Sequence, residues 1–248
     1  MPEVGLDEVR RDWTKLGAED PLWAVLVAPD KRGGHWAVDE FLATGRADVD
    51  EMIGWLTGLG LPVRWERALD FGCGVGRLSQ ALAGHADEVV GVDIASSMLD
   101  TARRLDRSDG VCRYVLNDSP DLGQFPDGHF DLVYTALVLQ HLPRPAIDRY
   151  LAEFLRVLRP GGTAVVQVPT RPLWTVRGVI WRFAPYRLIA WGQRRVLGYP
   201  APMRMTGVPD RAVTALVTAH GGEIVDRRDD LPYTPDWQCT RYVLRRKP

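Results

Sequence analysis

The nine residues LDFGCGVGR, at positions 69–77, decide the fold of this chain. The apolar residues before the glycines predict a strand over 67–71, and the pattern that follows predicts a helix over 75–83. Glycines between a strand and a helix let the backbone turn tightly and let a ligand approach main-chain atoms that a Cβ would block. In an open α/β sheet this turn lies at the carboxyl ends of the strands, where ligands bind.

Short apolar runs and amphipathic stretches alternate along most of the remaining chain. Further strands are predicted over 88–92, 112–116, 130–135, 163–168, 223–226 and 241–245, and further helices over 96–105, 146–158 and 210–219. Residues 1–65 have a mostly helical pattern, with one clear helix over 48–61. Strands that alternate with helices predict a largely parallel sheet covered on both faces.

The composition is that of a globular protein that needs no metal or disulfide support. Of the 248 residues, 46% are hydrophobic and 25% are charged, which excludes a disordered chain. The cysteines Cys73, Cys112 and Cys239 lie far apart and form no C-x-x-C pair, which argues against structural zinc and a disulfide framework. The charged first residues do not resemble a signal peptide, and no apolar run is long enough to span a membrane. We therefore expect a cytoplasmic protein without a metal.

The strand after the glycine turn ends on a carboxylate that suits a ribose. Asp93 follows Gly74 by nineteen residues, and an acid at that place accepts two hydrogen bonds from a ribose diol. The glycine spacing is G-x-G-x-G, whereas dinucleotide folds use G-x-G-x-x-G with a pyrophosphate at the helix N-terminus. Asp70, two residues before the first glycine, would repel a pyrophosphate and suits a cationic amino group. The pattern predicts a nucleoside with a positively charged tail, and it disfavours a nicotinamide-dependent oxidoreductase.

Five motifs in order resemble the class I S-adenosylmethionine-dependent methyltransferases over about residues 64–168. They are the DFGCGVG turn at 70–76 with its Asp93, LNDS at 116–119, FPDGHFDLV at 125–133, LQHL at 139–142 and LRVLRPGG at 155–162. The resemblance implies an α/β fold with a Rossmann-like, seven-stranded, mostly parallel sheet, helices on both faces and an antiparallel last strand. It implies S-adenosylmethionine as cofactor, S-adenosylhomocysteine as product, and no metal.

We expect one methyltransferase domain over 1–248. Its parts are a helical N-terminal cap over 1–65, a cofactor-binding core over 66–168, a basic aromatic lid insertion over 169–209, and a final helix and strands over 210–248.

The resemblance also implies a set of cofactor-binding residues. Gly72 and Gly74 would line the methionine part of the cofactor, and Ile94 would pack against the adenine face. Asp118 would accept a hydrogen bond from the adenine amino group, and Thr135 would meet the methionine amine through its backbone. The full set is Asp70, Gly72, Cys73, Gly74, Asp93, Ile94, Asp118, Ser119 and Thr135. Two alternatives stay open, namely that Asp70 is a structural helix cap and that Asp118 is a turn-forming residue.

Methyl transfer from a sulfonium is an in-line displacement that depends mainly on positioning and a desolvated site. A base is needed only when the acceptor holds its proton at neutral pH, as a phenol does. His141, after the fourth predicted core strand, is the candidate base, and a packing or helix-start role is the equal alternative. His35 is the second candidate, with an exposed loop position favoured over it. No chemistry is expected from the other histidines, His85, His129 and His220.

The segment over 169–209 is too long for a simple connection between strands and should have structure of its own. It contains no Asp or Glu and carries seven arginines, Arg171, Arg177, Arg182, Arg187, Arg194, Arg195 and Arg204. The rest of the chain carries 24 basic and 32 acidic residues. The leading interpretation is a lid over a bulky apolar substrate. A solvated helical pair and an interfacial helix over 171–199 that touches a membrane are the alternatives. Nucleic acid is disfavoured because the rest of the chain is acidic.

The aromatic residues of the N-terminal cap are open to two interpretations. Trp13, Trp23, Trp36 and Phe41 could close over the cofactor or pack on the edge of the sheet. The sequence does not separate the two.

The function that these patterns indicate is methyl transfer to a small, apolar or aromatic molecule through oxygen or nitrogen, with carbon not excluded. A protein that keeps the cofactor fold without methyl transfer is the alternative. The identity of the acceptor and the oligomeric state stay open.

Overall fold

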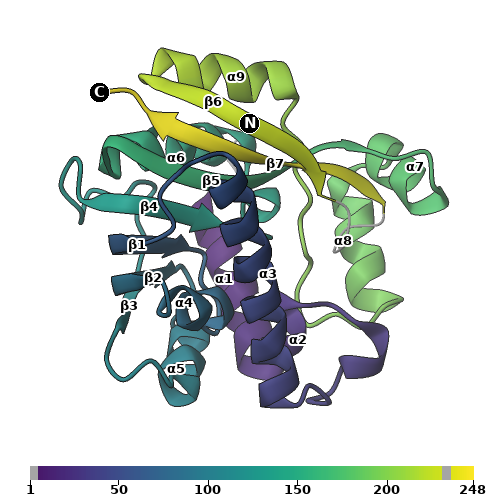
Figure 1. Cartoon of the computed structure of the whole chain (residues 1–248). Coiled ribbons are helices and arrows are strands. Elements are labelled where there is room, and N and C mark those ends of the chain that lie inside the picture. The colour runs from purple at the N-terminus through teal and green to yellow at the C-terminus, as the bar shows by residue number, and fades with distance from the viewer. Residues whose placement is uncertain (1–4, 231–235) are drawn as a thin grey trace.

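A computed structural model describes residues 5–230 and 236–248 of the chain. Within them the strands form one twisted, seven-stranded sheet in the order β3-β2-β1-β4-β5-β7-β6 (Figure 1). β7 runs antiparallel to both of its neighbours, and the other strand pairs are parallel. This topology confirms the predicted mostly parallel sheet with an antiparallel last strand.

The strands are β1 Trp65–Phe71, β2 Ala86–Asp93, β3 Cys112–Leu116, β4 Phe130–Thr135, β5 Leu158–Pro172, β6 Gly222–Asp230 and β7 Trp237–Arg246. The helices are α1 Leu6–Glu19, α2 Pro21–Val25, α3 Val38–Gly58, α4 Arg77–Leu82, α5 Ser96–Leu105, α6 Arg144–Val157, α7 Val176–Phe183, α8 Tyr186–Arg195 and α9 Asp210–Ala219, with short 3-10 turns at Pro29–Lys31 and Leu139–His141.

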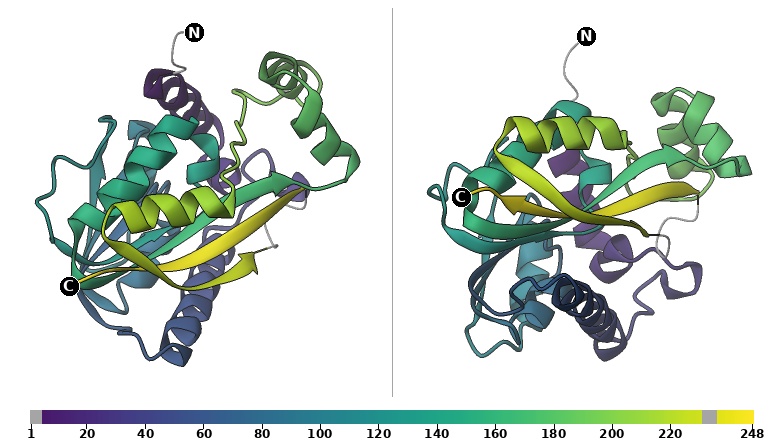
Figure 2. Two further views of the ribbon diagram at one scale, coloured as in Figure 1. Left: turned by 90° about the horizontal axis from the view of Figure 1, so that it is seen from above. Right: turned by 45° about the horizontal axis from the view of Figure 1, so that its top comes forward.

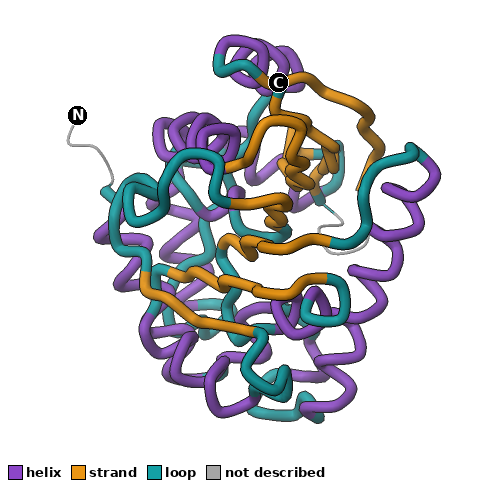
Figure 3. The backbone as a smooth tube through the Cα atoms, turned by 60° about the vertical axis from the view of Figure 1, so that its left-hand side comes forward, coloured by secondary structure: helices purple, strands orange, loops and turns teal. Residues whose placement is uncertain are grey.

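Helices cover both faces of the sheet (Figure 3). On one face, α6 and α9 pack on apolar strand residues such as Leu69, Val133 and Val166. On the other, α3 and α4 pack on the alternate residues of the same strands, such as Ala68 and Leu132. Because successive strand residues point to opposite faces, this alternation fixes the pairing register of the sheet.

The contact between α3 and α4 depends on a missing side chain and a buried ion pair. A Cβ on Gly45 would lie 2.3 Å from the carbonyl oxygen of Arg77, so only glycine lets the helices approach this closely. The Arg77 guanidinium donates to the Asp48 carboxylate at 2.6 Å, and the two side chains are only 2% and 11% exposed. The pair anchors the start of α4, directly after the glycine turn.

Differences from the expected elements lie at their ends. The predicted helix over 48–61 begins ten residues earlier, at Val38, because Val38, Phe41, Leu42 and Gly45 share one inward face. β5 continues past 168 to Pro172 because β7 pairs with it as far as Trp237. The first residues of the expected insertion over 169–209 therefore belong to the sheet, and the helical pair α7 and α8 follows (Figure 2).

Replacing Asp48 with alanine leaves the Arg77 guanidinium buried without its carboxylate. We expect Asp48→Ala to lower the free energy of unfolding by about 3–5 kcal/mol, measured by urea denaturation. The matched control is Asp39→Ala, which breaks an exposed pair with Arg107 at the same distance of 2.6 Å. That control should stay within about 0.5 kcal/mol of the wild type. Equal effects of the two variants would show that burial does not decide the strength of the pair.

Candidate functional site

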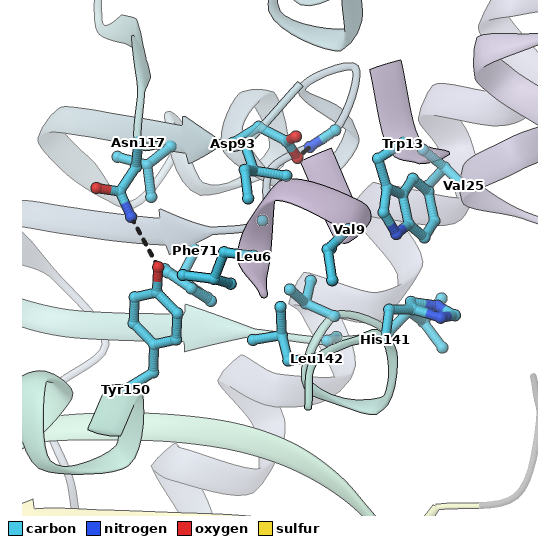
Figure 4. Close-up of a pocket in the computed structure, with 17 residues that line it drawn as sticks. Leu6, Val9, Trp13, Val25, Phe71, Asp93, Asn117, His141, Leu142 and Tyr150 are labelled. Atoms are coloured by element: carbon cyan, nitrogen blue, oxygen red, sulfur yellow. Dashed lines mark hydrogen bonds between the residues drawn. The ribbon is translucent and has the colours of Figure 1, made fainter. Parts of the chain in front are cut away.

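The carboxyl ends of β1, β2, β3 and β4 meet at a pocket of about 700 Å³ that opens to solvent (Figure 4). Polar groups are few in its lining. The lining residues are Leu6, Val9, Trp13, Val25, Phe71, Gly72, Gly74, Val92, Asp93, Ile94, Asn117, Ala136, Leu137, Val138, His141, Leu142 and Tyr150. Of the predicted cofactor residues, Gly72, Gly74, Asp93 and Ile94 come together here, and so does the candidate base His141.

The glycine turn forms the floor of the pocket. The N–H groups of Gly72 and Cys73 both donate to the Val92 carbonyl, at 2.8 and 2.9 Å, so the turn folds back onto β2. Gly72 has φ +74°, and a Cβ there would lie 2.3 Å from a methyl group of Val138. Only glycine therefore satisfies both the backbone angle and the close approach of the opposite wall.

Asp93 is held by the two loops that it joins. One carboxylate oxygen accepts from the Gly74 N–H and the other from the Ala95 N–H, both at 2.9 Å. Burial raises the pKa of Asp93, and these backbone hydrogen bonds oppose the rise. Each oxygen keeps lone pairs in addition to the one it uses. The carboxylate therefore lines the pocket as a fixed acceptor for hydroxyl groups.

Helix α1 forms the roof of the pocket through Leu6, Val9 and Trp13. It is tied to α5 by the Ser97 hydroxyl, which donates to the Thr14 carbonyl at 2.9 Å. Trp13 is thus the member of the N-terminal aromatic set that reaches the pocket. Trp23 and Phe41 are buried in a cluster between α1, α2 and α3, against which Trp13 also packs.

The loop after β4, which forms one wall of the pocket, has a backbone conformation that the sequence does not predict. Leu137 has φ +64°, in the left-handed region that a leucine rarely adopts. Its N–H donates to the Gln167 side-chain oxygen at 2.6 Å, and the Gln167 amide donates to Asp230 at 2.7 Å. Arg241 donates to the same Asp230 oxygen at 3.0 Å. This buried chain of polar groups holds Leu137 and Val138 against the pocket.

Asn117 and Tyr150 are pocket residues that sequence reasoning missed. The Asn117 amide donates to the Tyr150 hydroxyl at 3.2 Å, as Figure 4 shows. That hydroxyl donates to the Ser119 carbonyl at 2.7 Å. Asn117 lies inside the LNDS motif, next to Asp118, which the resemblance predicts as the adenine-binding residue. No sequence feature marks Tyr150 as a site residue, because its position in helix α6 has the spacing of an ordinary buried residue.

His141 lies at the wall opposite the glycine turn. Its Nδ1 is 2.7 Å from the carbonyl oxygen of Arg204. A carbonyl can only accept, so Nδ1 carries the proton in this contact and Nε2 keeps its lone pair. Burial lowers the pKa of His141 to about 4, which the hydrogen bond to Arg204 partly opposes. The ring of Trp13 packs edge-on against it, with 4.8 Å between centroids.

Asp70 lies beneath the glycine turn and is not part of the pocket lining. It is buried on the face that α4 covers, where the Ser79 hydroxyl donates to it at 2.6 Å. Its other oxygen has no hydrogen-bond partner among the described residues. Burial raises the pKa of Asp70 to about 6, although the Ser79 hydrogen bond and the Arg77 charge oppose this.

Four other predicted residues lie outside the pocket lining. Cys73 is buried under the turn, where burial raises the pKa of its thiol. Asp118 is exposed at the rim and pairs with Arg10 of α1 at 3.5 Å. Ser119 donates to Asp121 at 2.7 Å. Thr135 is buried, and its successor Ala136 is the residue that lines the pocket.

Among residues 5–230 and 236–248, no group of three or more His, Cys, Asp or Glu side chains is placed to hold a metal ion.

Because the pKa of Asp70 is raised, we expect the free energy of unfolding to depend on pH. Because its folded pKa of about 6 exceeds the ordinary aspartate value of 3.8, the stabilising effect of holding the proton is complete below about pH 4. It is lost as the pH rises through 6. Asp70→Asn, which stays neutral, should raise the free energy of unfolding by about 2–3 kcal/mol at pH 8 and by little at pH 4.

Denaturation at both pH values checks this. Asp121→Asn is the control of opposite sign, since hydrogen bonds from Ser119 and Gly123 lower the pKa of Asp121. That variant should lose stability at pH 8 and less at pH 4. A difference between Asp70→Asn and wild type that does not change with pH would contradict the burial argument.

Comparison with known proteins agrees with the sheet order and the turn. Residues 69–166 match the family described as methyltransferase domain. The 2-methyl-6-phytyl-1,4-hydroquinone methyltransferase of Synechocystis sp. is 30% identical over 155 residues, which are 62% of this chain and 48% of that protein. Demethylmenaquinone methyltransferase of Clavibacter sepedonicus is 39% identical over 119 residues, 47% of this chain and 46% of that protein. The chain spans about half the length of these curated relatives.

The fold itself is found in solved structures. Magnesium protoporphyrin IX methyltransferase of Synechocystis, with bound S-adenosylhomocysteine, superposes with a TM-score of 0.63 at 18% identity, covering 96% of this chain and 98% of that one. The methyltransferase-domain match begins in β1 and ends in β5, so it includes the carboxyl ends of β1, β2, β3 and β4 that form the pocket. On this match, the relatives and the shared fold, the chain carries a methyltransferase domain over residues 69–166, in a fold like that of S-adenosylmethionine-dependent methyltransferases.

Proposed function

We propose that this chain binds S-adenosylmethionine beneath α1 and transfers its methyl group to a small, apolar, phenol- or hydroquinone-like molecule, through oxygen or carbon, with nitrogen not excluded. The observation that carries the proposal is the Asp93 carboxylate, fixed by Gly74 and Ala95 at one end of a mostly apolar pocket. We place this activity in the cytoplasm. No helix among the described residues is long and apolar enough to cross a membrane.

The residues present fit this cofactor. The glycine turn leaves a cradle that a Cβ at Gly72 would fill, and Asp93 offers acceptors to a ribose diol. Ile94, next along the chain, would lie against the adenine face. Asp118 at the rim would take the adenine amino group by exchanging its contact with Arg10. Asp70 would act from beneath the turn, through its charge, on a cationic amine.

S-adenosylmethionine supplies a methyl group already activated by the sulfonium. The chain's own contribution is therefore positioning and exclusion of water. Leu6, Val9 and Trp13 cover the pocket from above, and the loop at Leu137 and Val138 closes it from the side. Transfer would move the positive charge from the sulfonium to the acceptor, which then gives up a proton, so a dry site would favour the dispersal of charge.

In this proposal, His141 accepts a hydrogen bond from the hydroxyl group of the acceptor and takes its proton during transfer. With Nδ1–H bound to the Arg204 carbonyl, Nε2 can accept a hydrogen bond from a hydroxyl in the pocket. Its pKa of about 4 keeps the ring neutral at physiological pH. A base of this strength orients the hydroxyl and withdraws the proton only as the oxygen–methyl bond forms. The packing of Trp13 against the ring supports the same orientation.

A pocket that holds the cofactor without methyl transfer is the alternative function. The two are separated by incubating the protein with S-adenosylmethionine and a panel of phenols and hydroquinones, and measuring S-adenosylhomocysteine. Acceptor-dependent release supports methyl transfer. Cofactor binding without release for any acceptor would favour the alternative.

Asp93→Ala removes the proposed acceptor for the ribose hydroxyls. We expect the affinity for S-adenosylhomocysteine to fall about 10- to 100-fold, the equivalent of about 1.5–3 kcal/mol for a charged hydrogen bond. Calorimetric titration measures it. Asp118→Ala is the comparison at the rim, where the carboxylate is exposed, and should have the smaller effect. Unchanged affinity in Asp93→Ala, with the fold intact by circular dichroism, would remove Asp93 from the site.

His141→Ala should slow transfer to a hydroxyl acceptor by about 10²-fold and leave S-adenosylhomocysteine affinity nearly unchanged. His129→Ala is the matched control, because His129 packs on Phe125 and Phe130 away from the pocket. With a folded pKa near 4, the wild-type rate should not fall between pH 8 and pH 5 through protonation of His141. Full activity of His141→Ala would assign this residue to packing.

A further inference from the structure

Helix α7 turns an apolar face to solvent. Val176, Val179, Ile180 and Phe183 repeat at positions i, i+3, i+4 and i+7, so they share one side of the helix. All four are exposed, Val176 by 83% and Phe183 by 70%. The opposite side holds Gly178, which is buried, and Trp181, which packs edge-on against Trp237 of β7. The helix is therefore seated on the protein by its other side.

Large apolar side chains on both sides of α7 in the sequence are exposed as well. Trp174, just before it, is 73% exposed, and Leu188 and Trp191 of α8 are 58% and 57% exposed. Figure 2 shows that the two helices project from the body of the molecule. Proteins rarely leave so many large apolar side chains uncovered in one segment unless another surface covers them. We call Trp174, the α7 stripe, Leu188 and Trp191 the α7–α8 face.

Positive charge surrounds this face. Residues 169–209 contain seven arginines and no acidic residue. The ion pairs of the segment are long, with Arg177 at 4.0 Å from Asp236 and Arg194 at 3.7 Å from Asp12. Arg182 lies over the Trp174 ring, 4.5 Å from its centroid. Arginine beside exposed tryptophan, phenylalanine and leucine is the composition of a helix that lies in the interface of an anionic bilayer.

The helix pair also adjoins the site. Tyr186, the first residue of α8, lines a smaller pocket of about 250 Å³ with Pro202 and Arg204. Glu8 and Asp12 form its polar rim. The smaller pocket shares Val9, Trp13 and His141 with the main one. The start of α8 therefore lies next to residues that also line the proposed methyl acceptor site.

We propose that the α7–α8 face docks on an anionic membrane surface and that the acceptor is a lipid-soluble molecule collected from it. The acceptor part rests on the proposed function, whereas docking does not, because it can be measured without cofactor or acceptor. The electrostatic attraction acts over about a Debye length, and the apolar side chains hold the contact.

The experiment is sedimentation of the full chain with vesicles of phosphatidylcholine alone and of phosphatidylcholine with phosphatidylglycerol. We expect binding to the anionic vesicles, weakened by salt. The triple variant Val176→Ser, Ile180→Ser, Phe183→Ser should bind at least tenfold more weakly. The double variant Arg187→Gln, Arg195→Gln should bind more weakly and with less dependence on salt.

Matched controls use exposed residues elsewhere. Val27→Ser with Val225→Ser removes exposed apolar side chains, and Arg64→Gln with Arg113→Gln removes exposed arginines near the strands β1 and β3. Both controls should sediment as the wild type does. Affinity of the triple variant for S-adenosylhomocysteine should be unchanged, which separates loss of docking from loss of the cofactor site.

Three results would overturn the proposal. The wild type could stay in solution with both vesicle types, or the triple variant could bind as well as the wild type. A concentration-dependent dimer in analytical ultracentrifugation, lost in the triple variant, would assign the face to a second copy of the chain. Vesicle binding without methyl transfer to any acceptor would leave docking standing and contradict the proposed function.

Discussion

The Asp93 carboxylate joins the two loops on which the pocket depends. Its oxygens accept from Gly74 in the turn after β1 and from Ala95 at the start of α5. The same turn is bound to β2 through the Val92 carbonyl. A charged acceptor fixed by two backbone donors cannot rotate without losing both. The position of the glycine turn, the start of α5 and the polar end of the pocket are therefore set by one side chain.

The structure around this arrangement contains features that each cost folding free energy. Two carboxylates, the buried Asp70 and the half-buried Asp93, lie near each other, and loss of contact with water raises the pKa of both. Leu137 is held in a left-handed conformation by Gln167, which in turn is held by Asp230 and Arg241. Such features persist where the fold over-determines them, and they are typical of sites whose geometry is formed before the ligand arrives.

The sequence predicted the parts of the fold that depend on local pattern. The bounds of α5, β3, β4 and α9 agree with the expectation, because turn residues and apolar periodicity mark both of their ends. The length of β5 was not predictable, because its last residues are strand only through pairing with β7. The early start of α3 was not predictable, because Gly45 interrupts the helical pattern of the sequence. A glycine is needed there because Arg77 approaches the helix too closely for a side chain.

The site residues likewise divide into those that the local sequence pattern predicts and those that depend on tertiary contacts. Gly72, Gly74, Asp93 and Ile94 line the pocket because a strand end places the residues that follow it at the ligand edge of the sheet. His141 lines it from the turn that follows β4. The roles of these residues stay predictions. Other residues depend on tertiary contacts that one sequence does not show. Asn117 reaches the pocket through its bond to Tyr150, whereas its neighbour Asp118 points to Arg10 at the rim. One residue along a loop separates a lining side chain from an exposed one.

We propose that the pocket beneath α1 binds a nucleoside with a charged methionine tail. The most direct measurement is a calorimetric titration of the wild-type chain with S-adenosylmethionine, S-adenosylhomocysteine and NADH. We expect saturable binding of the first two in the micromolar range, at one site per chain, and none of NADH. Binding of NADH, or of none of the three to a chain shown to be folded, would contradict it.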